Sequence, residues 1–63
     1  MWKPKKLEFY YYVETNGKVG QTQLCDMAIT KGMVKVHNCF KTKKKAEIAA
    51  EKFREILNDM QED

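Results

Sequence analysis

The chain has 63 residues, with no serine, one histidine, two cysteines and no long run of apolar residues. Without such a run, no transmembrane helix is predicted. The basic first residues also lack the apolar stretch of a signal peptide. We therefore expect a soluble protein in the cytoplasm of its cell, with no membrane partner.

The few residues suited to nucleophilic or metal chemistry are His37, Cys25 and Cys39. A Cys39–His37 pair on one strand is sterically conceivable, but a small sheet offers no pocket that excludes water around it. The two cysteines fit reduced thiols in a reducing compartment, with one disulfide as the alternative. Their spacing does not supply four zinc ligands. We predict no enzyme, no metal site and no cofactor.

Charge is unevenly distributed along the chain. Residues 1–45 carry ten lysines and three acids, a net charge of +7, whereas residues 46–63 carry two basic and six acidic side chains, a net charge of −4. A basic front half suggests an anionic partner such as nucleic acid or an acidic protein. The alternative is that the lysines only keep a small domain soluble.

Alternating side chains over residues 7–13 predict a strand, and Asn16-Gly17 predicts a hairpin with a two-residue loop. In that register Tyr12 faces Gln21 and Tyr10 faces Gln23. The predicted buried face holds Leu7, Phe9, Tyr11, Val13, Thr22 and Leu24. The predicted exposed face holds Glu8, Tyr10, Tyr12, Glu14, Val19, Gln21 and Gln23.

The segment from Asp26 to Gly32 fits either a short helical turn capped by Asp26 or a loop. A third strand is predicted from Met33 to Phe40. Its inward side chains are predicted to be Val34, Val36 and Phe40, and its outward ones Lys35, His37 and Cys39.

Thr42 is the expected N-cap of a helix that runs from Lys43 to about Met60. Its apolar residues recur at three- and four-residue spacing and predict one stripe packed on the sheet. The stripe holds Ala46, Ala49, Ala50, Phe53, Ile56, Leu57 and Met60. The predicted architecture is α+β, a three-stranded antiparallel sheet packed on one long C-terminal helix, in the order β-β-β-α. It forms a single domain over residues 1–63, with a basic arm (1–6), the sheet (7–40) and the helix (42–60).

Three lysines, Lys43 to Lys45, fill the first turn of this helix, where the helix dipole favours acids. Two interpretations fit this arrangement. Either exposed charges matter little there, or an anion such as phosphate binds at the helix start.

The segment from Phe40 to Glu47 resembles the junction between the third strand and the helix in the arm-type DNA-binding domain of tyrosine recombinases. That resemblance implies a three-stranded sheet that enters the DNA major groove. The whole chain also resembles small uncharacterised proteins of bacteriophages and prophages. The matching features are Trp2 and Pro4, the tyrosines at 10–12, Gly17, and Asn38 through Thr42.

These features predict a non-enzymatic binding module of phage type. We expect it to engage nucleic acid through an exposed Tyr/Gln sheet face and a lysine cluster. The alternative, implied by the phage resemblance, is an anti-defence protein (anti-CRISPR-like) that binds and inhibits a protein of its bacterial host. Homodimerisation through apolar surface is a further expectation. The predicted binding residues are Tyr10, Tyr12, Gln21, Gln23, Lys35, His37, Lys41, Lys43, Lys44 and Lys45.

Overall fold

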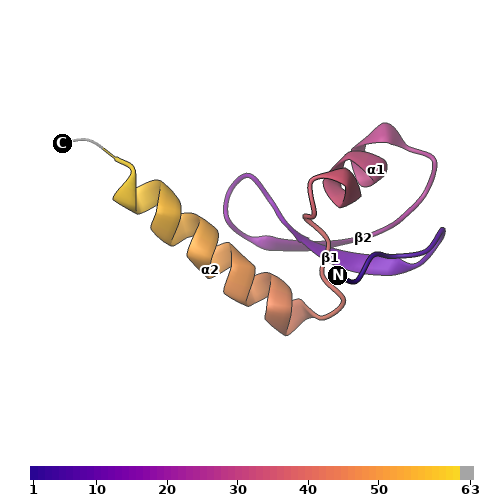
Figure 1. The fold of residues 1–63 in the computed structure, drawn as a ribbon, viewed down its shortest axis with the longest axis horizontal. Helices are drawn as coiled ribbons and strands as arrows, with labels where there is room; N and C mark the ends of the chain where they lie inside the picture. The colour runs from indigo at the N-terminus through magenta and orange to yellow at the C-terminus, as the bar shows by residue number, and fades with distance from the viewer. Residues whose placement is uncertain (62–63) are drawn as a thin grey trace.

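The computed structural model describes residues 1–61. The elements follow one another as β1 (Phe9–Val13), β2 (Val19–Gln23), α1 (Ala28–Lys35) and α2 (Lys43–Asp59). Figure 1 shows α1 on one side of the β1–β2 hairpin and α2 on the other. The fold is α+β, but the predicted three-stranded sheet with one long helix is wrong, because within residues 1–61 the sheet has two strands and there are two helices.

The predicted hairpin is confirmed, but its loop is one residue longer than expected. The Glu14 N–H donates to the Lys18 carbonyl at 2.7 Å, and the Gly17 N–H donates to the Glu14 carbonyl at 2.9 Å. Gly17 has φ +80°, the left-handed conformation that closes a three-residue hairpin loop. Asn16 supports the loop by accepting the Lys18 N–H at 2.9 Å.

This loop shifts the register of β2 by one residue, so that Tyr10 lies opposite Thr22 and Tyr11 lies opposite Gln21. A shift of one residue moves every side chain of one strand to the other face relative to its partner. The predicted pairs of Tyr12 with Gln21 and Tyr10 with Gln23 are therefore wrong.

The two faces of β1 are also covered differently from the prediction. Leu7 and Phe9, expected in the core, are 58% and 59% exposed, whereas Tyr10, expected on the surface, is fully buried. Tyr11 and Val13 are half-buried. The cause is α1, which covers the Tyr10 face and leaves the hairpin with a helix on each side.

The predicted third strand from Met33 to Phe40 is wrong, because α1 occupies its first half. For the segment from Asp26 to Gly32, the helical alternative is right. The helix continues past Gly32, however, and its N-cap is Met27 rather than Asp26. The buried Thr30 fixes the helix start: its hydroxyl lies 2.9 Å from the Met27 carbonyl and accepts the Cys25 N–H at 3.3 Å.

α1 ends in a Schellman motif, in which two N–H groups bond back to the last helical carbonyls. The His37 N–H donates to Val34 at 3.0 Å and the Asn38 N–H donates to Met33 at 2.8 Å. His37 takes the left-handed position with φ +65°. The turn reverses the predicted orientations beyond the helix, since Val36 is 70% exposed and Cys39 is buried.

A remnant of the third strand survives after this turn. Tyr11 and Phe40 form a single antiparallel bridge, with reciprocal hydrogen bonds of 2.9 and 2.8 Å. Two residues further along β1, at Val13, the side chain of Asn38 makes the hydrogen bonds that a third strand would make. Its Oδ1 accepts the Val13 N–H at 2.8 Å and its Nδ2 donates to the Val13 carbonyl at 2.9 Å. One amide group thus replaces a backbone partner along this edge of β1.

The predicted C-terminal helix is confirmed as α2, and Thr42 is its N-cap, accepting the Lys45 N–H at 3.2 Å. Ala46 and Ala50 are buried against the hairpin because their small side chains allow a close approach. Beyond Ala50, every described residue of the helix is exposed. Figure 1 shows this second half of α2 extending past the hairpin, and the molecule accordingly measures 43 × 23 × 19 Å.

Candidate functional site

Tyr10 is part of the core and not of a binding surface. It is fully buried, and its hydroxyl donates to the Thr30 carbonyl of α1 at 2.9 Å. Burial raises the pKa of its phenol above the usual value. Its predicted role in recognition is corrected, because no partner reaches this side chain in the folded protein.

Tyr12 shares the face of Tyr10 and packs mainly within the protein. The two rings lie edge to face with centroids 6.3 Å apart. Across the hairpin, the Tyr12 ring lies over Gly20, where a Cβ atom would stand 2.6 Å from the ring carbon Cζ. Gly20 therefore provides the space that this ring fills, and Tyr12 is half-buried.

Gln21 and Gln23 lie on the opposite face from the two tyrosines. Residues directly opposite in an antiparallel pair share a face, and these two oppose Tyr11 and Phe9. Gln23 is further engaged, because its Nε2 donates to the Leu7 carbonyl at 2.6 Å. The predicted Tyr/Gln face does not exist as one surface, since the one-residue register shift divides its members between the two sides of the sheet.

The four predicted lysines lie at and just before the start of α2, and all are exposed. Lys41 and Lys45 line one hollow and Lys43 lines another, beside the hairpin loop. No acid lies in the first turn of the helix. Lys43 is 4.0 Å from Glu47 in a solvent-exposed ion pair, which contributes little to stability. The cluster consists of Lys41, Lys43, Lys44 and Lys45.

The N-terminal arm folds back onto this lysine cluster. Met1 and Trp2 line a hollow of about 190 Å³ together with Cys39, Lys41 and Lys45. The arm residue Lys3 lies near enough to Cys39 for its charge to favour the thiolate, although burial dominates and raises the pKa of that thiol. The sequence suggested that the arm lysines and the cluster would both contact an anion, and the structure adds that Met1 and Trp2 of the arm lie beside Lys41 and Lys45. We call the hollow and the lysines next to it in sequence the basic surface. The half-buried Trp2, Lys41 and Lys45 line the hollow, and Lys3, Lys43 and Lys44 are the neighbouring exposed lysines.

Of the other two predicted residues, His37 borders the basic surface and Lys35 does not. His37 is exposed and lines the same hollow as Trp2. Lys35 lies in the last turn of α1, the helix on the other side of the hairpin (Figure 1).

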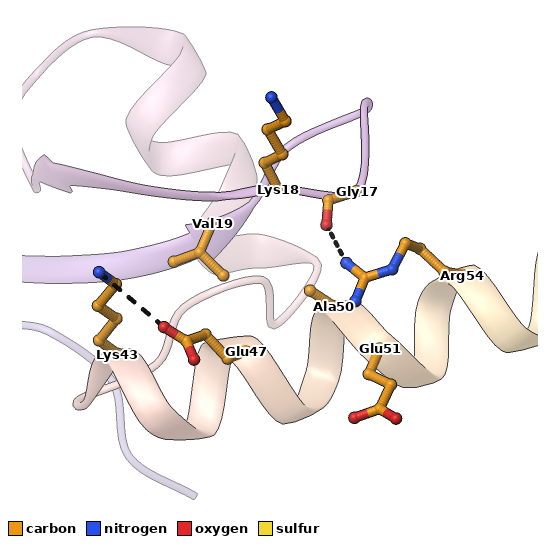
Figure 2. Close-up of a pocket in the computed structure, with 8 residues that line it drawn as sticks. All are labelled: Gly17, Lys18, Val19, Lys43, Glu47, Ala50, Glu51 and Arg54. Carbon is orange, nitrogen blue, oxygen red and sulfur yellow. Dashed lines mark hydrogen bonds and ion pairs between the residues drawn. The ribbon is translucent and has the colours of Figure 1, made fainter.

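Another hollow, of about 400 Å³, lies between the hairpin loop and α2 (Figure 2). Arg54 crosses it, and its Nη1 donates to the Gly17 carbonyl at 2.5 Å. The aliphatic part of the Arg54 side chain lies 3.0 Å from the position that a Cβ of residue 17 would take. Glycine at this position therefore allows both the left-handed turn and the close approach of Arg54. Three basic side chains (Lys18, Lys43 and Arg54) and two acidic ones (Glu47 and Glu51) line the hollow, so neither sign of charge dominates it. We assign it a structural role: Arg54 ties the hairpin loop to the middle of α2.

Both cysteines are free thiols, Cys25 half-buried and Cys39 buried. Hydrogen bonds from the Met27 backbone, and next from Thr30, lower the pKa of Cys25. Among residues 1–61, no group of three His, Cys, Asp or Glu side chains is arranged to hold a metal ion. The part of the chain described by the structure has no helix long and apolar enough to cross a membrane.

Comparison with known proteins gives no match: no family model, curated protein or solved structure is similar to this chain. The resemblances to phage proteins and to the recombinase arm domain therefore stay predictions.

Proposed function

We propose that this chain is a non-enzymatic binding module that contacts nucleic acid through the basic surface. The observation that carries the proposal is the return of the N-terminal arm to the start of α2, which places Trp2 beside Lys41 and Lys45. Lysines supply phosphate contacts, and an aromatic ring beside them suits the stacking of a base.

The electrostatics of the start of α2 support the same partner. Among residues 1–61, the cluster of Lys41, Lys43, Lys44 and Lys45 has one ion pair, that of Lys43 with Glu47. The helix dipole adds partial positive charge at this end. A polyanion would relieve the repulsion among the lysines and release its own counterions.

The alternative function, capture and inhibition of a host protein, was predicted to use Tyr10 and Tyr12. Tyr10 is buried and Tyr12 packs on Gly20, so neither of these two tyrosines is free to anchor a protein partner. We therefore favour nucleic acid over a host protein as the partner.

Fluorescence anisotropy with labelled single-stranded and duplex DNA tests the proposal. We expect binding at about 50 mM salt that weakens steeply towards about 200 mM, because each phosphate contact adds about 0.7–0.9 to the slope of log K against log salt. Replacing Lys44 and Lys45 by Gln should lower the affinity and reduce that slope by about 1.4–1.8.

The matched control replaces Lys31 and Lys35, two exposed lysines of α1, by Gln. It removes the same charge from the far side of the hairpin, so we expect nearly unchanged affinity. Absence of binding to every DNA at about 50 mM salt, or an equal loss in both double variants, would show that the basic surface is not a nucleic-acid site.

A further inference from the structure

The apolar stripe of α2 is covered by the hairpin over its first half only. Ala46 and Ala50 are buried, whereas Ile56, Leu57 and Met60 are 61%, 47% and 75% exposed. These residues continue the stripe at three- and four-residue spacing, so they occupy the same side of the helix. Burying one such side chain fully stabilises by about 1.5–3 kcal/mol, and a helix face of this kind is typical of an interface.

The exposed stripe continues into a shallow hollow beside it. Phe53, 38% exposed, borders a volume of about 370 Å³ that Val13, Val36 and Phe40 also line. Val36 is itself 70% exposed at the end of α1. The apolar area is therefore a ridge, formed by the end of α2, next to a groove, formed between Phe53 of α2, the end of β1 and the turn that follows α1.

We propose that this area is the interface between two copies of the chain, which pair through the second halves of their α2 helices in antiparallel orientation. A ridge beside a groove is self-complementary under two-fold symmetry, as an interface between identical patches must be. The ridge of each copy enters the groove of the other.

The charges beside the stripe favour a second copy, and they favour the antiparallel orientation. Lys52 lies one turn before Ile56 and Asp59 lies one turn after it, so the three share a row along the helix. With Ile56 at the two-fold axis, Lys52 of each copy faces Asp59 of the other. A parallel pair would instead bring Lys52 onto Lys52 and Asp59 onto Asp59, and like charges repel.

The antiparallel pair also has a consequence that rests on the proposed function. Lys44 is 12 residues from Ile56, so at about 1.5 Å per residue the two lysine clusters lie about 36 Å apart. One turn of B-DNA spans about 34–36 Å. The two basic surfaces are thus spaced to contact one face of a duplex.

Sedimentation equilibrium of the full chain without nucleic acid tests the dimer independently of the proposed function. We expect a monomer–dimer equilibrium in which Ile56→Glu raises the dissociation constant by about thirtyfold or more. The matched control is Asn58→Glu. Asn58 is exposed but lies two residues from both Ile56 and Met60, on the opposite side of α2, so its replacement should leave the equilibrium unchanged.

A charge exchange tests the orientation with variants whose changes lie on the surface. Lys52→Glu and Asp59→Lys should each weaken the dimer at low salt, and the double variant should restore it. Circular dichroism should show a native helical signal for every variant. A chain that stays monomeric up to millimolar concentration, a dimer unaffected by Ile56→Glu, or a double variant weaker than either single one would overturn the proposal.

Discussion

Replacing Asn38 by Ala should destabilise the fold more than the replacement of a partly exposed side chain usually does. The Asn38 amide makes two hydrogen bonds to one residue, Val13, at 2.8 and 2.9 Å. They satisfy the N–H and the carbonyl that β1 would otherwise present to an absent third strand. They also connect the end of α1 to the hairpin, because Asn38 belongs to the Schellman turn.

The expected cost follows from those two bonds. Each contributes about 0.5–1.5 kcal/mol net, and partial exposure lets water replace some of the lost bonding. We expect a loss of about 2 kcal/mol. A chain of this length has a total stability of about 3–9 kcal/mol, so the melting temperature should fall by about 8–16 °C.

Thermal and urea unfolding followed by circular dichroism measures this loss. Asn58→Ala, in the exposed second half of α2, is the matched control and should change stability by less than about 0.5 kcal/mol. A melting temperature for Asn38→Ala within about 2 °C of the unmodified chain would refute the strand-replacing role of the amide.

Two further outcomes follow from the local geometry. His37→Gly should raise stability by about 0.5–1 kcal/mol, because glycine adopts the left-handed position (φ +65°) without the Cβ penalty; an unchanged or lower melting temperature would contradict this. Cys25, with its lowered pKa, should be alkylated at neutral pH before Cys39, whose pKa burial raises; peptide mass mapping showing Cys39 modified first would refute the assignment.

The sequence was sufficient to predict α2 and the existence of the hairpin. Both signals are local: the Thr42 cap with its apolar spacing, and alternating residues before Asn16-Gly17. The predicted register was wrong by one residue, because Gly17 serves a two-residue or a three-residue loop equally well from sequence alone. The longer loop then decides which side of the sheet each glutamine occupies.

The prediction from Met33 to Phe40 failed because its residues fit two periods. Val34, Val36 and Phe40 alternate as in a strand, but Ile29 and Met33 are also spaced as in a helix. Thr30 decides between them through tertiary contacts with Cys25 and Tyr10. The same contacts bury Tyr10, so the misplaced recognition face and the missing strand have one cause.

The lysine cluster was predicted from a run of residues, and the arm lysines were expected to act with it, but the packing of Met1 and Trp2 against the cluster was not predicted. Met1 and Trp2 are about 40 residues from Lys41 in sequence, and no local pattern relates them. The exposed second half of α2 was also missed, because an apolar stripe does not reveal where its covering sheet ends.

The most direct test of the account is the intrinsic fluorescence of Trp2, the single tryptophan, during titration with DNA. Trp2 lies within the basic surface, so its emission should change in intensity or wavelength as DNA binds, and the change should reverse when salt is raised. Emission that stays constant while anisotropy reports saturated binding, or an absence of binding at low salt, would contradict the proposed site.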